Sequence, residues 1–212
     1  MLPTPHIITF VLMTLDTGHR SDADSEVVIG AATLAMRIER GKASFSLSTY
    51  VLRPEEPAEN LLAWIDHQLA DEQATLALYR PERVVQLLEL LPGADMSPGV
   101  RSIKGRGVQP LIRMKIADHR GFLSFRDACA FSRIACASTD NIQRHAAWGR
   151  NDIDQIVADA EIDAIAGWRM ALNAIGRQNG LGAELATIMR RHLAEWLFDT
   201  DHPYTRFFQR PN

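Results

Sequence analysis

The first third of the chain has the hydrophobic pattern of β-strands. Residues 7–15 form a continuous apolar run, which predicts a central strand buried on both faces. Residues 27–38 predict a second strand. Residues 43–52 alternate apolar or β-branched residues with serines, as a half-exposed strand does. Three sequential strands with tight connections, one of them the Gly-Lys turn at residues 39–42, predict an antiparallel meander.

The pattern then changes to helices separated by a short strand. Residues 58–69 and 81–91 carry apolar stripes of helical period, and residues 74–79 between them predict a strand. The glycine-rich stretch 93–107 predicts a long loop, a type of segment that often carries function.

After residue 123 the pattern is helical throughout. Ser124 is a candidate N-cap, Asn151 is the candidate N-cap of a long helix that reaches Gly180, and residues 183–198 predict a last helix. The fold class predicted from this order is α/β: a mixed sheet of an antiparallel meander plus parallel strands, flanked by helices, with a helical C-terminal half. This is the outline of ribonuclease H-like folds. We expect one domain over residues 1–212, in which residues 183–212 are a C-terminal helical extension.

Composition supports an ordinary globular protein. Apolar residues make up 46% of the 212 residues and charged residues 23%, enough for a sizeable core. Cys129 and Cys136 lie in apolar surroundings with no neighbouring Cys/His set, so we expect buried thiols and no zinc site. The N-terminal apolar run is too short to cross a bilayer and lacks a basic flank, so we expect a cytoplasmic protein without membrane contact.

Charge is unevenly distributed along the chain. The net charge of −3 gives no overall attraction to nucleic acid, but the segment from residue 101 to residue 126 carries seven cations and one acid, Asp118. The cations of this basic segment are Arg101, Lys104, Arg106, Arg113, Lys115, Arg120 and Arg126. One interpretation is a phosphate-binding stripe, and the other is a solvated loop.

Three acids are the candidates for chemistry. Asp159 and Asp163 are four residues apart and therefore share one helical face. Asp16 follows the first strand, where α/β sheets tend to build sites. A strand acid and a helix acid that meet are half of the carboxylate cage of a two-metal nuclease. The alternatives are that Asp16 is a turn residue and that both helix acids face solvent near a helix N-terminus.

Two stretches carry a resemblance to a known family. Residues 8–57 follow the order strand, Asp, loop, strand with Ile-Gly-Ala, Gly-Lys turn and strand ending in Arg-Pro. Residues 149–182 contain a Gly-Arg-x-Asp lead-in, then Glu161, Asp163 and Trp168 on a long helix. The chain thereby resembles the DEDD-type 3′–5′ exonucleases. It is similar to the predicted exonucleases related to the proofreading domain of B-type DNA polymerases.

The resemblance implies a metal site that is only partly kept. The family uses four carboxylates, of which Asp16 and Asp163 match. Gly18 stands in place of the first motif's Glu, Val84 lies near the expected second Asp, and Asp159 replaces a Tyr. The resemblance therefore implies Asp16 and Asp163 as ligands of Mg²⁺ or Mn²⁺ if any metal binds, with Asp159 assisting catalysis. It also implies weak or absent nuclease activity, because two carboxylates are too few anchors for two Mg²⁺ ions.

Two hypotheses follow. In the first, the chain is a degenerate 3′–5′ exonuclease-like domain that binds single-stranded DNA or RNA through the basic segment. In the second, it is a non-catalytic scaffold whose helical C-terminal half makes homodimer or partner contacts. Joint exposure of Trp148, Trp168 and Trp196 would favour the scaffold.

Overall fold

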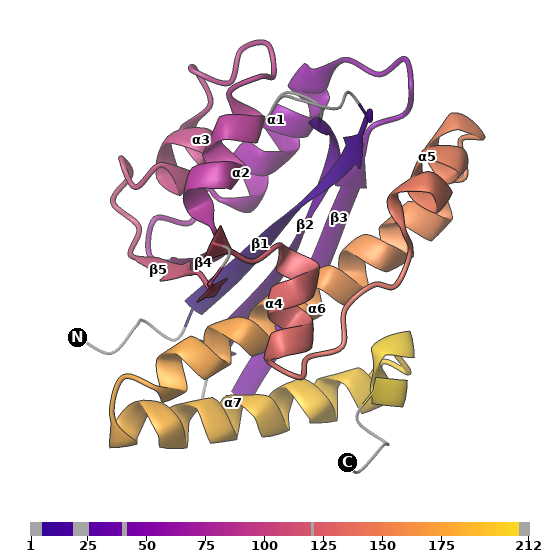
Figure 1. Cartoon of the computed structure of the whole chain (residues 1–212). Helices are drawn as coiled ribbons and strands as arrows, with labels where there is room; N and C mark the ends of the chain where they lie inside the picture. Colours follow the sequence, from indigo (N-terminus) through magenta and orange to yellow (C-terminus); the bar gives the residue numbers. More distant parts are fainter. Residues whose placement is uncertain (1–5, 19–25, 40–41, 120, 208–212) are drawn as a thin grey trace.

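A five-stranded mixed sheet is the centre of the molecule (Figure 1). The computed structural model describes residues 6–18, 26–39, 42–119 and 121–207. The strand order is β3-β2-β1-β4-β5; β1, β2 and β3 are antiparallel, whereas β4 and β5 run parallel to β1. The strands are β1 (His6–Asp16), β2 (Glu26–Glu39), β3 (Lys42–Val51), β4 (Thr75–Tyr79) and β5 (Leu111–Met114). The predicted meander is confirmed, although residues 40–41 of its Gly-Lys turn lie outside the described residues.

Helices cover both faces of this sheet (Figure 1). On one face lie α1 (Ala58–Gln68), α2 (Pro81–Leu88) and α3 (Pro98–Ile103). On the other lie α4 (Phe125–Phe131), α5 (Asn141–Gly149), α6 (Ile153–Gly176) and α7 (Gly180–Asp199). Here α6 lies directly against the strands, and α7 packs on α6 and β3. The predicted α/β class with a helical C-terminal half is confirmed, and the arrangement is consistent with a ribonuclease H-like fold.

Strand β1 separates two hydrophobic cores. Its residues alternate between faces, so that Ile7 and Met13 join the core under α6, while Ile8 and Phe10 join the core under α1 and α2. This double burial explains the continuous apolar run. In the part of the chain that the structure describes, no helix is long and apolar enough to cross a membrane.

Some elements differ from the sequence-based expectations. The predicted loop at 93–107 contains helix α3, which begins after Ser97, whose Oγ accepts a hydrogen bond from the Val100 N–H at 3.1 Å. Asn151 is not an N-cap, because its φ of +57° is left-handed and a capping residue needs an extended backbone. The helix begins at Ile153 instead. A short hairpin of β6 (Ala117–Asp118) and β7 (Gly121–Phe122), and a final 3₁₀ helix (Pro203–Phe207), were also not predicted.

Candidate functional site

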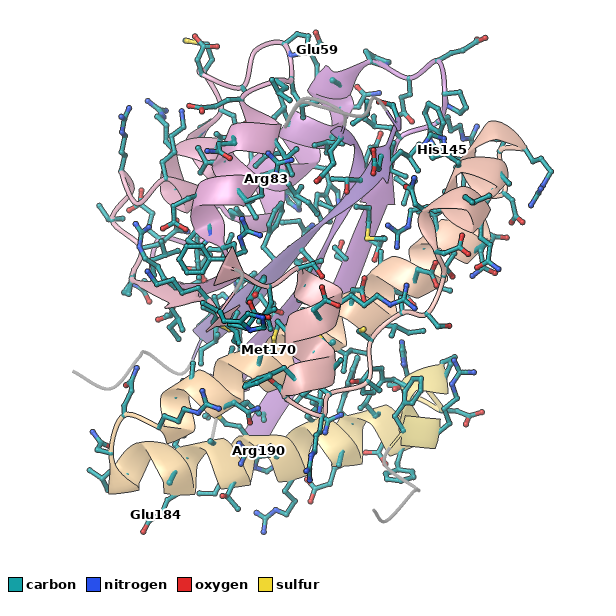
Figure 2. The ribbon with its side chains drawn as sticks, viewed as in Figure 1. Glu59, Arg83, His145, Met170, Glu184 and Arg190 are labelled. Atoms are coloured by element: carbon teal, nitrogen blue, oxygen red, sulfur yellow. The ribbon has the colours of Figure 1, made fainter. Side chains whose placement is uncertain are left out.

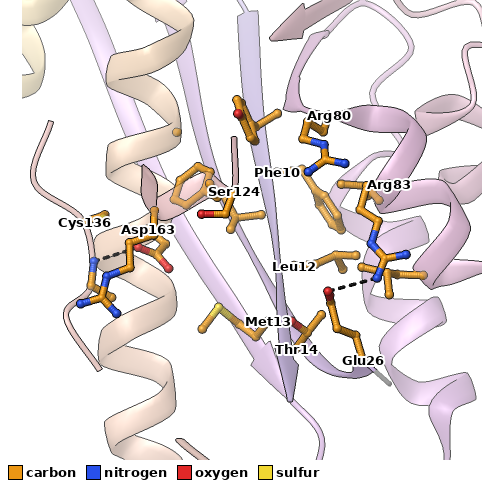
Figure 3. Close-up of a pocket in the computed structure, with 18 of the residues that line it drawn as sticks. Phe10, Leu12, Met13, Thr14, Glu26, Arg80, Arg83, Ser124, Cys136 and Asp163 are labelled. Atoms are coloured by element: carbon orange, nitrogen blue, oxygen red, sulfur yellow. Dashed lines mark hydrogen bonds and ion pairs between the residues drawn. The ribbon is translucent and has the colours of Figure 1, made fainter. Parts of the chain in front are cut away.

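A pocket of about 440 Å³ opens where the parallel strands end. Its floor is apolar and includes Phe10, Leu12 and Met13 of β1, while α2 forms one wall and α4 to α6 form the other (Figure 3). The volume suits one small organic ligand or one nucleotide, because ligand pockets measure roughly 300–1,000 Å³. The position also suits a ligand, since open α/β sheets bind ligands beyond the carboxyl ends of their strands.

Unequal strand lengths create this pocket. Pairing between β1 and β4 ends at Phe10 and Leu78, yet β1 continues to Asp16. The last six residues of β1 therefore have β2 on one side and, among the described residues, no neighbouring strand on the side of β4. Side chains from both faces of the sheet line the resulting notch, among them Leu12 on one face and Val11 on the other.

Asp163 is the buried acid of the pocket. Its side chain comes from α6 and points into the cavity (Figure 3), and one oxygen accepts a hydrogen bond from the Ala137 N–H at 2.9 Å. Burial raises the pKa of Asp163 to about 6, and the Ala137 bond and the charges of Arg144 and Arg126 oppose that shift. Asp163 is therefore a carboxyl group that exchanges its proton near neutral pH.

Asp159 lies one turn earlier on α6 and is also buried, at 4% exposure. Its Oδ1 accepts only a long contact of 3.5 Å from Gln155, and its Oδ2 has no hydrogen-bond partner among the described residues. Because both acids are buried, the alternative in which they face solvent is wrong. The helix-dipole explanation applies instead to Asp154, which lies in the first turn of α6.

Asp16 lines the same pocket as Asp163 but is exposed at its rim. Its carboxylate accepts the Gly18 N–H at 2.9 Å, the contact expected of a turn residue. The Asn141 amide holds the backbone of Asp16 through two hydrogen bonds of 2.9 and 2.8 Å, and His145 Nε2 lies 2.8 Å from the Asp16 carbonyl oxygen. By strand alternation the Asp16 side chain leaves β1 on the face opposite α6. The structure thus brings the two acids into one cavity from opposite faces of the sheet.

Four arginines surround the pocket and give it cations on both walls. Arg83 lies on α2 (Figure 2) and pairs with Glu26 at 3.0 Å (Figure 3). Arg126 donates to the Ser138 carbonyl at 3.3 Å. Arg144 donates from Nη1 to the Thr14 carbonyl at 3.3 Å, and its buried Nε has no partner among the described residues. Arg80, at the N-terminus of α2, lies beside the pocket with a left-handed φ of +48°.

Sequence reasoning found only Arg126 of these four, as part of the basic segment. The pair Arg80 and Arg83 had a usable signal, because both follow the end of a predicted parallel strand. The sequence carried no such signal for Arg144, because this residue reaches the pocket only through the packing of α5 against β1.

The remaining cations of the basic segment do not gather at this pocket. Lys104 pairs with Glu89 at 2.7 Å and Arg113 with Glu82 at 3.1 Å. Arg101 and Arg106 are exposed at and after α3 and do not line the pocket, and Arg120 lies outside the described residues. Lys115 approaches the hairpin instead, with its Nζ 5.4 Å from the centroid of the Phe122 ring.

The two cysteines lie close together beside Asp163. Cys129 is buried on α4, as expected, whereas Cys136 is half-buried and lines the pocket. A hydrogen bond from the Cys129 thiol lowers the pKa of Cys136, while the same bond raises the pKa of Cys129. The pocket therefore offers one accessible thiol.

Comparisons of the chain with protein-family models, with curated proteins and with solved structures found no match. The kinship with exonucleases stays a prediction from the sequence, and the site is interpreted from its own geometry.

A divalent metal does not fit the pocket well. Within the described ranges, no group of three or more His, Cys, Asp or Glu side chains is placed to hold a metal ion. On the face that α6 covers, β1 lines the pocket with Val11 and Met13, which are not carboxylates. Helix α6 packs closely against this face, because a Cβ on Gly167 would lie 3.3 Å from the Val11 side chain. Arg144 and Arg126 act electrostatically on Asp163, and their positive charge opposes cation binding.

Proposed function

We propose that this chain is a ribonuclease H-like domain that binds single-stranded nucleic acid at the pocket and does not hydrolyse it by two-metal chemistry. The observation that carries the proposal is the combination of an apolar floor with arginines on both walls of one notch. A nucleotide needs that combination, because its base has apolar faces and its phosphate is an anion. Guanidinium groups bind phosphate oxygens in pairs, and they do so without a metal.

Among the described residues, the acids of the pocket neutralise only part of this cation set. Glu26 is paired with Arg83, and Asp140 caps α5 by accepting the Gln143 N–H at 2.8 Å. Asp163 takes up a proton as the pH falls toward 6, which removes one negative charge from the cavity. The arginines near Asp163 would then face the phosphate of a bound strand.

The proposal is tested by the binding of a fluorescein-labelled oligothymidylate, measured by fluorescence anisotropy at several salt concentrations. We expect Arg126→Ala and Arg80→Ala to weaken binding several-fold. Each should also reduce the slope of log K against log salt by about one for every phosphate that is no longer neutralised. Arg191→Ala is the matched control, because Arg191 is an exposed arginine of α7 whose partner is Glu195.

Two results would refute the proposal: no binding by the unaltered protein at low salt, or pocket variants that behave like Arg191→Ala. Incubation of the same oligonucleotide with Mn²⁺ tests the second half of the proposal. Cleavage that disappears in Asp163→Ala would restore the metal-dependent exonuclease predicted from the family resemblance.

The scaffold hypothesis has weaker support in the structure. Trp168 is fully buried, Trp148 donates from its ring to the Leu52 carbonyl at 2.8 Å, and Trp196 stacks on His202. The three tryptophans are thus not exposed together. A homodimer through the C-terminal half stays a prediction, which sedimentation across a concentration series would test.

A further inference from the structure

A second hollow lies next to the pocket, beneath the hairpin of β6 and β7. Residues of the hairpin and of α4 line it, and Ser124 lines both cavities. Two aromatic side chains border this hollow and are exposed: Phe122, at 55%, and Phe131, at 68%. Apolar side chains that are exposed next to one another, unlike single ones, form the kind of patch that marks a binding site.

Two cations flank the Phe122 ring. Lys115 Nζ lies 5.4 Å and Arg80 Cζ 5.8 Å from the ring centroid, within the range of cation–π attraction. Neither cation forms an ion pair with any residue that the structure describes. Arg80 also lines the pocket, so it stands between the pocket and the exposed ring.

Acids line the hollow from both the hairpin and α4. Asp118 and Asp127 line it, and Asp127 accepts a hydrogen bond from the Ser124 hydroxyl at 2.7 Å. Asp118 and Asp127 repel a phosphate, whereas Arg80 and Lys115 attract one, so a phosphate would lie nearer the two cations. The flat face of a nucleobase suits the exposed Phe122 ring.

We infer that Phe122 is a stacking platform for the nucleobase that follows the one held in the pocket, and that Arg80 and Lys115 bind the phosphate that joins the two nucleotides. This inference rests on the proposed function and extends it, because a site that spans two cavities takes a strand rather than a free nucleotide. Stacking on an aromatic ring does not depend strongly on base identity. The platform therefore predicts length dependence without strong sequence preference.

The platform can be tested with a single strand that carries 2-aminopurine, a base whose fluorescence falls when it stacks. We compare the unaltered protein with Phe122→Ala, Phe122→Trp and the control Phe198→Ala, since Phe198 of α7 is similarly exposed at 52%. Thermal melts confirm that each variant is folded. Phe122→Ala should lose about tenfold in affinity for the strand and most of the quenching. Phe122→Trp should restore both, and Phe198→Ala should behave as the unaltered protein does.

A mononucleotide, thymidine monophosphate, separates the inference from the proposed function. The platform predicts that Phe122→Ala binds the mononucleotide as well as the unaltered protein does, because the pocket is intact.

If Phe122→Ala retains full strand affinity, the platform is refuted and the proposed function stands. Equal loss for strand and mononucleotide would place the ring inside the pocket and refute a separate subsite. Equal competition by polyglutamate would identify an acidic peptide as the ligand instead. If the unaltered protein binds neither nucleotide nor strand, the proposed function fails and the platform fails with it.

Discussion

Replacement of Asp163 by Asn should stabilise the protein at neutral pH. Its pKa is about 6 in the folded protein against an ordinary value of 3.8, because burial disfavours the charge. Between these two values the folded protein holds a proton that the unfolded chain has released. Stability therefore falls as the pH rises from about 4 to about 6, and it stays low above that.

The size of the effect follows from the pKa difference. A shift of about two units at about 1.4 kcal/mol each costs the folded state up to about 3 kcal/mol above pH 6. The asparagine that replaces Asp163 carries no charge, and its amide oxygen can still accept the Ala137 N–H. We therefore expect Asp163→Asn to raise the free energy of unfolding at pH 7.5 by up to about 3 kcal/mol. For a chain of this length that is several degrees in Tm, at about 2–4 °C per kcal/mol.

Urea denaturation of both proteins at a series of pH values from 4 to 7.5, followed by tryptophan fluorescence, provides the measurement. The two curves of stability against pH should meet near pH 4 and separate as the pH rises. Asp95→Asn, which removes an exposed carboxylate after α2, should lie close to the unaltered protein throughout. Two results would show that burial does not control the pKa of Asp163. One is an Asp163→Asn protein that is less stable than the unaltered protein at pH 7.5, and the other is a difference in stability between the two proteins that does not change with pH.

Three further predictions concern binding, packing and reactivity. Strand affinity should increase as the pH falls from 7.5 to 5.5, because protonation of Asp163 removes a negative charge, and Asp163→Asn should abolish that dependence in the same anisotropy assay. Gly182→Ala should lower the free energy of unfolding by about 1–3 kcal/mol in a denaturant melt, because the new Cβ would lie 2.4 Å from the Ile175 carbonyl oxygen. Gly180→Ala has open space around it and should change that free energy little. Equal losses of stability in the two variants would contradict this packing argument. Cys136 should react with a disulfide reagent faster than Cys129, because it lines the pocket and its pKa is lowered; mass spectrometry that finds Cys129 modified first would contradict this.

The sequence predicted the elements whose pattern is set by local burial. The unbroken apolar run of β1 indicated a strand with a core on each face, and the order of strands and helices indicated a mixed sheet. Helix α3 was missed because its Ser-Pro start lies in a glycine-rich stretch. The hairpin of β6 and β7 was missed because two-residue strands leave no periodic pattern.

The candidate site was only partly predictable, because it depends on tertiary geometry. Asp163 was named from the sequence as a candidate and lines the pocket, yet its contact with the segment around Ala137 was revealed by no pattern. Asp16 was selected for its place at the end of a strand, and the alternation of β1 then directs its side chain away from α6. The notch between the arginines exists because β4 ends earlier than β1, and the sequence of neither strand alone reveals that difference.

The notch beside the end of β1 has a mechanical consequence. Elsewhere the two helical layers are separated by the sheet, but at the notch α2 and α6 border the same space. A molecule bound there would cross-link the layers and stiffen both. Amide hydrogen exchange should consequently slow in α2 and α6 together when a ligand fills the notch, although these helices lie on opposite faces of the sheet.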